Sequence, residues 1–531
     1  MTASRTPPLL AGTPERARFT AVLRAEWTKF RTVRGWVLAP ITAAVLCLVF
    51  TFLVANGTHT ESCTGAGICK PGHAFVPTGP DGRAVADSYY TVGLRLTGDG
   101  TVTTRVTSLT GVVSTAPAGV APAQAQRTRP GLPAWAKAGI LLRPSTRQGS
   151  AYAAVMATGG HGDRLQYDYG NDRAGRRGPV SPASPHWLRL TRTGDTVTGY
   201  DSADGTTWAP IGTAHLTGLP ATVYAGLFVT SPVSFRTSAE GSRTLATAAF
   251  DHTTIDDRAG VGGRAASGAW QGQSIGAGQQ DFYPTLRPGG FHRAGGSFVI
   301  SGSGDIAPAV VQGLLGTGTP SSSLPFGLTV ALIVVIVVAT MFITAEYRRG
   351  LIRVTFAAVP CRRRVLVAKA VVIGAVAFVI AAVAAAAAIP LGEHVLRANG
   401  AYVFPVGALT VLRVITGTAA LAAVSAVAVL AVGTIARKSA AAVAGGVVVF
   451  VLPSIIGSIG SGDAVEWLYR LTPAAGFSVL QALPRSAQVD YPYTFANGYY
   501  PLAPWAGLGV LTAWAALAFG IAAVLLRRRD A

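Results

Sequence analysis

The stretch Phe326–Ala345, FGLTVALIVVIVVATMFITA, has 20 consecutive residues without Asp, Glu, Lys or Arg. A bilayer core of roughly 30 Å requires about 20 apolar residues in helical conformation, so this stretch predicts a membrane-spanning helix. Five further stretches have the same character. Together they predict a six-helix transmembrane domain, with spans at residues 36–55, 324–345, 370–391, 406–434, 439–460 and 504–526.

The composition agrees with a membrane protein. Half of the 531 residues belong to the apolar set and only 13% are charged, which is too apolar for an average soluble domain and excludes disorder. About 35 residues rich in basic side chains precede the first span, so that span is not a cleavable signal peptide. Arg supplies 39 of the 44 basic residues. With the frequent Ala, Gly and Val, this bias is associated with GC-rich bacterial genomes, and we expect a bacterial plasma-membrane protein.

The basic residues predict the orientation. Four flanks, 1–35, 346–369, 437–438 and 527–531, carry 19 basic and 4 acidic residues, and six alternating spans place them on one side. Since Lys and Arg accumulate on the cytoplasmic side of membrane proteins, both termini are expected there. Segments 56–323 and 461–503 are then extracellular. Topology thus accounts for most of the net charge of +20 without a nucleic-acid partner.

The long external segment, 56–323, predicts an all-β domain inserted between the first two spans. Its short apolar stretches alternate with polar residues and are separated by turns rich in Gly and Asp, such as 97–100 and 201–205. Such strands at this spacing are typical of a sandwich. The strand candidates are Tyr90–Leu96, Thr101–Val106, Ala138–Leu142, Tyr152–Ala157, Leu165–Tyr169, Trp187–Thr191, Thr196–Asp201, Trp208–Ala214, Thr222–Thr230 and Leu245–Asp251.

Several motifs in this segment resemble a known family. Leu96–Val102 (LTGDGTV), Lys137–Arg143 (KAGILLR) and Gly199–Trp208 (GYDSADGTTW) are similar to motifs of concanavalin A-like jelly-roll modules, as are Val223–Leu227 and Ala246–Asp251. The resemblance covers about 85–256 and implies a jelly-roll sandwich. The region of about 269–308 resembles the strands that normally open such a module. We expect a circular permutation that completes the jelly roll, and the alternative is a truncated second copy.

Catalysis by this domain is not expected. Glycoside hydrolysis needs two carboxylates facing each other across the bond, and no predicted strand carries two acids at alternate positions. Glycan binding is an open alternative to a purely structural role for the large aromatic residues. Its candidate residues are Trp135, Trp187, Tyr200 and Trp208.

Cys63 and Cys69 lie shortly after the first span, on the expected extracellular side. An oxidising compartment and a short loop containing Gly between them favour a local disulfide, and the alternative is two free thiols. No metal-binding spacing and no cofactor motif accompanies them.

Two stretches on the expected cytoplasmic side carry the functional information. In Leu23–Arg34, the residues Leu23, Trp27, Phe30 and Arg34 recur at helical spacing, which predicts an amphipathic helix at the membrane interface. In 346–369, a charged turn and a proline break return the chain to the membrane in a compact loop. Taken alone, the first stretch is also compatible with a helix that only anchors the chain. The second is also compatible with an ordinary basic loop on the cytoplasmic side.

Together these two stretches resemble the membrane subunits of bacterial ABC transporters of the type-2, exporter-like class. The matching motifs are Glu26–Thr32 (EWTKFRT) and Glu346–Arg353 (EYRRGLIR), with an Arg-rich return that ends at Ala368 and Lys369. The resemblance covers 20–55 and 324–531, and the large external insert departs from the family. It implies that residues 20–34 and 346–364 bind a separate ATP-binding subunit, and that a second permease copy or a homologous permease completes the transporter. The implied coupling residues are Glu26, Trp27, Lys29, Phe30, Arg31, Glu346, Tyr347, Arg348, Arg349, Gly350, Ile352 and Arg353.

The chain itself contains no GxxxxGK[ST] phosphate-binding loop, so its own ATPase activity is not expected. Two functions follow. The first is an ATP-driven permease subunit, which we expect to be an exporter. The second is a membrane-tethered glycan-binding or surface-sensing protein whose helices only anchor it. Charge reversal of Arg349 and Arg353 together would abolish the first function and leave the second unchanged, whereas changes at Trp187 or Trp208 would abolish the second.

Overall fold

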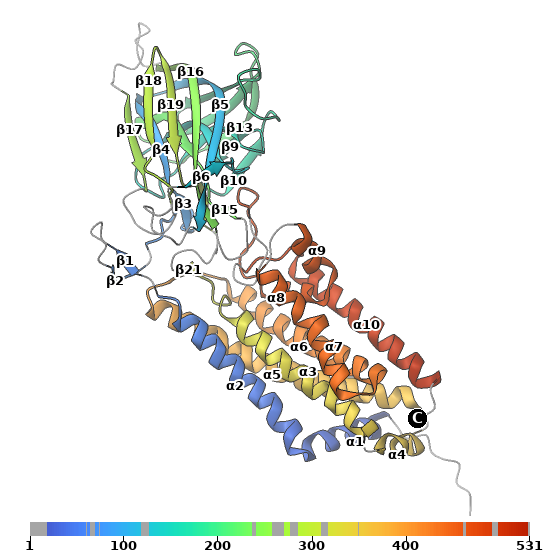
Figure 1. Ribbon diagram of the computed structural model, residues 1–531. Coiled ribbons are helices and arrows are strands. Elements are labelled where there is room, and N and C mark those ends of the chain that lie inside the picture. The colour runs from blue at the N-terminus through green and yellow to red at the C-terminus, as the bar shows by residue number, and fades with distance from the viewer. Residues whose placement is uncertain are drawn as a thin grey trace, which may run out of the picture.

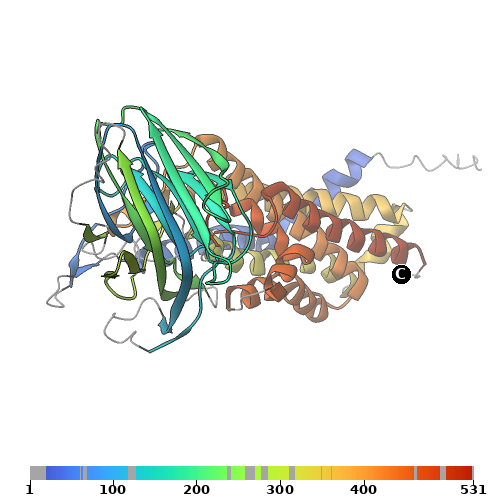
Figure 2. The same ribbon diagram turned by 90° about the horizontal axis from the view of Figure 1, so that it is seen from above.

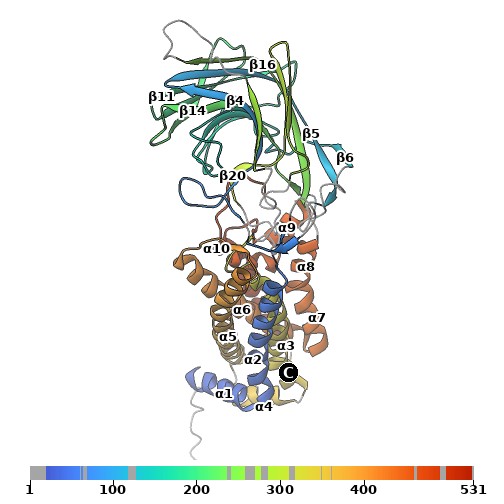
Figure 3. The ribbon, with the colours of Figure 1, turned by 90° about the vertical axis from the view of Figure 1, so that its left-hand side faces the viewer.

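The computed structural model describes residues 19–59, 61–63, 69–73, 75–117, 127–235, 241–257, 270–276, 285–309, 317–348, 350–359, 361–459, 463–490 and 498–528. They form a helical domain and a β domain, and Figures 1 and 2 show the β domain beyond one end of the helices. The chain passes from the helical domain into the β domain after α2 and returns at α3. We refer to the opposite end, where α1 and α4 lie in Figure 3, as the α1 end.

The helical domain contains five described helices that are long and apolar enough to cross a membrane, namely α2, α3, α5, α6 and α10. Shorter helices lie at both ends of this bundle. The helices are α1 (Phe19–Thr32), α2 (Arg34–Asn56), α3 (Leu324–Arg348), α4 (Leu351–Ala358), α5 (Arg362–Ala398), α6 (Ala408–Ala436), α7 (Ser439–Phe450), α8 (Leu452–Ile459), α9 (Asp463–Leu471), the 3₁₀ helix η1 (Pro473–Leu480) and α10 (Pro504–Arg528).

The expected span 439–460 is not one continuous helix. It is divided into α7 and α8 at Val451, and neither piece alone is long enough to cross a bilayer. Pro453 explains the break, because it lacks the backbone N–H for a helical hydrogen bond and its ring conflicts with the carbonyl four residues earlier. Val451 itself keeps helical dihedral angles, and its N–H bonds to the carbonyl of Val447, so α7 and α8 follow each other with one interruption and the span at 439–460 stays a prediction.

The segment 346–369 also differs from the expected loop. Helix α3 continues to Arg348, α4 occupies Leu351–Ala358, and α5 already begins at Arg362. Gly350 adopts φ = 68°, a left-handed conformation that glycine reaches at little cost, and this turn separates α3 from α4. The segment is therefore a compact helical hairpin.

The centre of the bundle is formed by α3 and α6. In their most apolar windows, 56% and 61% of the residues are buried, against 22% for α2 and for α10, so the latter two lie at the periphery. On the β-domain side, η1 packs closely against α10. A Cβ added to Gly507 would lie 2.1 Å from the backbone oxygen of Ala475, so this close approach requires glycine.

Arg413 in α6 fixes the same η1 segment. Its guanidinium donates hydrogen bonds to the backbone oxygens of Val479 at 3.2 Å and Gln481 at 2.5 Å. These carbonyls lie at and just beyond the end of η1, where helix geometry leaves them without partners. Arg413 therefore caps the end of η1 within the protein.

The β domain is a sandwich of two antiparallel sheets. The seven-stranded sheet has the order β10-β9-β8-β7-β14-β4-β17, and the larger sheet runs β13-β12-β11-β5-β16-β19-β18, with β6 and β15 attached. Their strands are β4 (Tyr89–Thr97), β5 (Gly100–Pro117), β6 (Thr128–Pro130), β7 (Lys137–Arg143), β8 (Ala153–Thr158), β9 (Asp163–Tyr167), β10 (Asn171–Ala174), β11 (His186–Thr193), β12 (Thr196–Ser202), β13 (Ala209–His215), β14 (Thr222–Thr230), β15 (Ser234–Phe235), β16 (Gly241–Asp257), β17 (Gln271–Ile275), β18 (Gly290–Ala294) and β19 (Ser297–Gly302).

Alternation of side chains builds the core between the sheets. Ile140 and Leu142 of β7 face Leu188 and Leu190 of β11 in the main cluster. Leu141, which lies between these two residues in β7, points to the opposite face of the sheet. There it belongs to a second hydrophobic cluster, which covers the outer side of the seven-stranded sheet. The central strands β7 and β8 of this sheet are therefore buried on both faces.

The region 269–308 contributes to these same two sheets. Its strand β17 pairs with β4 at the edge of the seven-stranded sheet, while β19 pairs with β16 and with β18 in the larger sheet. The short strand β20 (Ile306–Pro308) pairs with β3 (Val85–Asp87) below the sandwich. Among the described residues, the segment is part of one sandwich and forms no separate second copy.

The two domains are connected by more than the covalent chain. Strand β21 (Thr317–Gly318) pairs in parallel with β22 (Tyr402–Val403), which lies between α5 and α6. Ala84 of the β domain and Phe404 of the helical domain are buried in one small cluster. The base of the β domain is thus attached to the loops of the helical domain.

Candidate functional site

Helix α1 lies across the end of the bundle that is farthest from the β domain (Figure 3). Its buried residues are Val22, Glu26 and Phe30, at a spacing of four. The predicted apolar face with Leu23, Trp27 and Phe30 lines one groove beside α2 and α5, and Trp27 is 45% exposed there. Glu26 lies on the adjoining side of α1 and points inward.

A buried lysine explains why a carboxylate occupies the inner face. Lys369 of α5 has no exposed surface, and its Nζ lies 2.6 Å from Oε2 of Glu26 and 2.7 Å from Oε1 of Glu346 in α3. The ammonium group also lies 4.5 Å from the ring centroid of Phe342, a cation–π distance. One lysine therefore joins three helices that are distant in sequence.

A second lysine completes the cluster from its outer side. Lys29 Nζ lies 2.8 Å from Oε1 of Glu26 and 3.2 Å from Oε1 of Glu346, and Thr355 of α4 lies 3.4 Å away. Burial opposes the charged form of Lys29, but hydrogen bonds and charges from the two glutamates outweigh it and raise its pKa. We call Glu26, Lys29, Glu346 and Lys369 the ionic cluster.

The ionic cluster balances two positive and two negative charges. An unpaired charge in this environment would cost several kcal/mol. In the ionic cluster each lysine contacts both glutamates, so each buried charge has two partners of opposite sign. Such contacts are strongly dependent on geometry. Helix α1 is therefore held in a defined position relative to α3 and α5.

Aromatic and aliphatic packing surrounds the ionic cluster. Phe30 stacks between Trp27 and Trp36 and meets the edge of Phe342 at 5.7 Å. Ile352 of α4 is buried in the same hydrophobic cluster. The hairpin that contains α4 is thus packed on the same unit as α1.

The structure divides the sequence-predicted coupling residues into two groups. One group faces inward, with Glu26, Phe30, Glu346 and Ile352 buried and Lys29 and Tyr347 half-buried. The other group is exposed and consists of Trp27, Arg31, Arg348, Gly350 and Arg353. Arg349 lies outside the described residues. Only the exposed group is available to a partner protein.

Lys369 was not among the predicted site residues. The available signal was its position seven residues into α5, where the apolar span begins, together with the shortage of acids on that side. Since a charged residue inside a span usually has a partner, Glu26 and Glu346 were its natural candidates. The apolar periodicity of α1 gives no information on the pairing of Glu26, because the partner Lys369 is distant in sequence.

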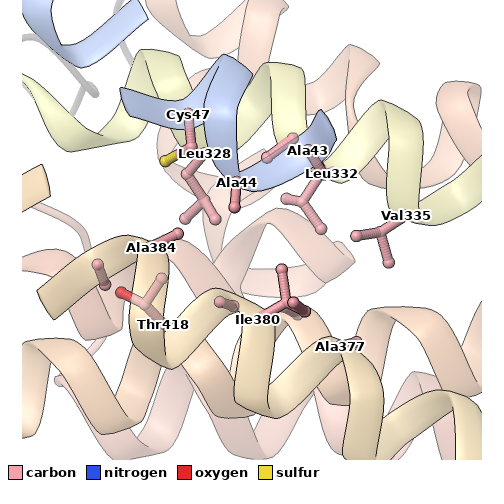
Figure 4. A pocket seen from close by; sticks show the side chains of 14 residues that line it. Ala43, Ala44, Cys47, Leu328, Leu332, Val335, Ala377, Ile380, Ala384 and Thr418 are labelled. Atoms are coloured by element: carbon pink, nitrogen blue, oxygen red, sulfur yellow. The ribbon is translucent and has the colours of Figure 1, made fainter. Parts of the chain in front are cut away.

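One cavity lies in the interior of the bundle. A cavity of about 20 Å³ lies among α2, α3, α5 and α6, lined by apolar side chains such as Cys47 and Leu328 (Figure 4). Thr418 supplies the polar exception, and its hydroxyl donates to the backbone oxygen of Val414. The volume accommodates about one water molecule, so this cavity is not a substrate site.

The aromatic candidates of the β domain occupy different environments. Trp135 is buried and stacks on His161 at 4.0 Å, so it is not available at the surface. Trp187, Tyr200 and Trp208 are half-buried. In the larger sheet Tyr200 lies opposite Arg189, whose guanidinium covers the ring of Trp208 at 3.7 Å.

Next to them, Arg105 lies 5.4 Å from the ring centroid of Trp187 and forms an ion pair with Asp251. Gly205 adopts φ = 77°, as expected for the glycine of the 201–205 turn, and packs against Trp187. Aromatic and arginine side chains thus share one face of the larger sheet.

The remaining predicted feature is the pair Cys63 and Cys69. Strands β1 (Glu61–Cys63) and β2 (Cys69–Pro71) form a hairpin whose register places the two residues directly opposite each other. Opposite residues in an antiparallel pair have Cα separations compatible with a disulfide. Their side chains lie outside the described residues, so the disulfide stays a prediction.

Within the part of the chain that the structure describes, no group of three or more His, Cys, Asp or Glu side chains is arranged to hold a metal ion.

Comparisons with known proteins add little. No protein-family model matches the sequence, and no curated protein matches it either. A functionally unknown protein from Saccharomyces cerevisiae is similar in structure, with 16% identity and a TM-score of 0.22 over 38% of this chain and 87% of that one. Scytalido-glutamic peptidase with a transition state analog inhibitor shows 8% identity and a TM-score of 0.25, over 40% of this chain and 98% of that one. At such TM-scores the likeness carries no argument about function.

Proposed function

We propose that the chain is the membrane subunit of an ATP-driven transporter of the ABC type, with the α1 end in the cytoplasm. The observation that carries this proposal is the ionic cluster. It connects α1 and the α4 hairpin, the two stretches that resemble such subunits, to the long helices α3 and α5.

A separate ATP-binding subunit needs a surface that transmits its movement. Among the described residues of the α1 end, exposed Trp27, Leu351 and Val354 provide apolar contact area. Exposed Arg348 and Arg353 provide positive charge beside it. Trp and Arg are enriched among the residues that dominate the energy of protein contacts.

The ionic cluster is suited to transmit force from that surface. Moving α1 away from α5 would separate Lys369 from two carboxylates in a buried environment, which costs several kcal/mol. Rigid movement of α1 together with α3 and α5 avoids this cost. A partner that tilts α1 and α4 would therefore tilt two membrane-spanning helices with them.

The pathway for a substrate is proposed to lie between two permease copies. Within one copy, the cavity of about 20 Å³ in Figure 4 leaves space only for a water-sized molecule. Relative tilting of two copies would open and close a route between them. We propose export as the direction, and this rests on the resemblance of Glu26–Thr32 and Glu346–Arg353 to exporter-like subunits.

For the β domain we propose a concanavalin A-like jelly roll with an accessory role outside the cell. The order of the motifs and the two-sheet sandwich support the fold assignment. Trp187, Tyr200 and Trp208 on the larger sheet support glycan binding as its role, because sugars stack on aromatic faces. We assign no catalysis to this domain.

The proposal is tested by purifying the chain from its native membrane in mild detergent and measuring ATP hydrolysis in the eluate. We expect a stoichiometric partner whose peptides, identified by mass spectrometry, include a GxxxxGK[ST] motif. The double charge reversal Arg348→Glu with Arg353→Glu should remove both this partner and the ATPase activity, while membrane insertion is unchanged.

The matched control is Arg527→Glu with Arg528→Glu. These arginines are exposed at the end of α10 and lie outside the proposed contact surface, so the same change of charge should retain the partner. An ATPase-free homodimer, or equal loss in both double variants, would contradict the proposal.

The second candidate is a membrane-tethered glycan-binding protein without transport activity. The aromatic and arginine face of the larger sheet is the observation that favours it. It predicts that Trp187→Ala and Trp208→Ala abolish binding to cell-wall glycans on an array, and that reversal of Arg348 and Arg353 has no effect on any function of the chain.

A further inference from the structure

A groove of about 550 Å³ runs along the helical domain near the α1 end, between α1 and α2 on one side and α5 on the other. Its volume is in the range of sites that hold organic molecules. Trp27, Phe30 and Ile41 form part of the first wall, and Ala375 and Val379 form part of the second. Every side chain that lines the groove is apolar except that of Arg31.

The groove faces the surroundings of the protein. Val379 is 57% exposed and Ile41 48% exposed, although both belong to helices that are long and apolar enough to cross a membrane. In a bilayer, exposed apolar side chains on such helices contact lipid acyl chains. An apolar groove of this kind must therefore be filled by a molecule that has a long apolar part.

The positive charge at the α1 end of the groove indicates which headgroup that molecule carries. Glu26 is the only acid of the described part of α1, and both of its oxygens already contact Lys29 and Lys369. Arg31 has no ion pair among the described residues. Arg24 and Arg34 are exposed nearby in sequence and add to the positive charge.

We infer that the groove binds one anionic phospholipid, with an acyl chain between α1, α2 and α5 and the phosphate at Arg31. A cationic side chain at the membrane surface favours anionic headgroups, and an apolar groove below it accepts the chain. The inference requires that the helical domain lies in a bilayer. It does not require the proposed ATP-binding partner, although Trp27 and Arg31 belong to both surfaces.

A second copy of the chain is a less suitable occupant. A two-fold contact would use the same patch on both copies, which would bring the exposed arginines of one copy toward those of the other. This juxtaposition of like charges is unfavourable. An anionic lipid neutralises the same arginines instead.

The test is native mass spectrometry of the full chain in detergent, titrated with dioleoyl phosphatidylglycerol or with dioleoyl phosphatidylcholine. These lipids have the same acyl chains and differ in headgroup charge. We expect the anionic lipid to bind about fivefold more tightly, as one arginine near an anionic headgroup predicts. Arg31→Gln should reduce this preference, with Arg24 and Arg34 accounting for what remains, and Ala375→Trp should weaken binding of both lipids because the indole fills the groove.

Two controls use exposed positions of α10 that do not line the groove. Arg528→Gln removes an equivalent charge at the end of α10, and Val524→Trp adds an equivalent indole. Both should bind the two lipids as the unmodified chain does. All four variants are checked by gel filtration, and since all four positions are exposed, their folding should be unchanged.

Equal affinity of the unmodified chain for both lipids would overturn the inference, as would an unchanged preference in Arg31→Gln. Conversion of a dimer to a monomer by Ala375→Trp, without any change in lipid binding, would also overturn it and identify the groove as an interface between copies. Loss of the ATPase partner in any variant does not bear on lipid binding, so the two proposals fail separately.

Discussion

Lys369 in α5 and Lys137 in β7 are both completely buried lysines, and both form ion pairs with residues far away in sequence. Lys369 contacts Glu26 and Glu346, which lie on two other helices, one of them the peripheral α1. Lys137 contacts Asp305 at 2.8 Å and the neighbouring backbone oxygen of Ile306 at 2.5 Å.

The two lysines differ in what they connect. Lys137 lies within one sandwich and joins the seven-stranded sheet to the segment that closes its outer side. Lys369 joins the peripheral helix α1 to the long helices α3 and α5. Burial of charge connects distant segments in both domains, and under the proposed function the ion pairs of Lys369 would also transmit movement of α1 to α3 and α5.

The largest effect is expected for Lys369→Met, which leaves Glu26 and Glu346 together without their buried partner. Breaking one side of a buried ion pair costs about 3–5 kcal/mol. Thermal unfolding of the full chain in detergent, followed by tryptophan fluorescence, measures the loss. Adding Glu346→Gln should recover at least half of it, because Glu26 then pairs with Lys29 alone. Equal instability of the single and double variants would show that the ion pairs are not the cause.

Lys137→Met should cost somewhat less, about 2–3 kcal/mol. Burial raises the pKa of Asp305, and removal of the lysine raises it further, so the carboxyl can become protonated and neutral. The loss of stability should therefore shrink as the pH is lowered, in the same fluorescence assay. A loss that is constant between acid and neutral pH would exclude this explanation.

Lys29→Met should cost about 1 kcal/mol, because the lysine side chain is 37% exposed and the pair is partly screened by solvent. The pKa of Lys29 is raised above its ordinary value of 10.5. Its stabilising contribution is therefore complete below pH 10.5 and is lost as the pH rises through the raised value. Unfolding curves of the unmodified chain and the variant should converge at high pH, and a difference that persists there would argue against a charge-based role.

The smallest effect is expected for Arg105→Gln on the surface of the larger sheet, at about 0.5 kcal/mol. The hydrogen bond from Arg105 lowers the pKa of Asp251, so the pair stabilises the fold above the ordinary pKa of 3.8 and is lost as the pH falls below it. Unfolding at neutral and at acid pH measures this difference. A loss of unfolding free energy as large as that of Lys137→Met would show that this pair contributes as much as a buried ion pair.

The sequence predicts most elements of both domains because their patterns are local. Phe326–Ala345 falls within α3, and the alternation in Thr222–Thr230 matches the bounds of β14. The break at Val451 was missed, since Pro453 can also be accommodated within a membrane helix when neighbouring groups satisfy the backbone. The strands of 271–302 were anticipated as part of the sandwich, but their partners β4 and β16 are far away in sequence.

The candidate site was predicted only in part. Sequence motifs identified Glu26–Thr32 and Glu346–Arg353 as a pair of stretches, and the structure brings them together at one end of the bundle. It also shows that Glu26, Glu346 and Ile352 face inward, where a partner protein cannot reach them. Arg31 was placed among the coupling residues, and only the groove beside it suggests a lipid phosphate as its partner.

The sequence by itself determined that the chain has long apolar helices and a β domain between the first two of them, because hydrophobic length and period are local properties. Tertiary structure decided which face of α1 is buried. Apolar periodicity identifies the side of α1 that carries Leu23, Trp27 and Phe30 but cannot show that Glu26 is buried. The carboxylate is buried because it pairs with Lys369, which lies 343 residues away in the chain, and such long-range charge pairing leaves no local pattern.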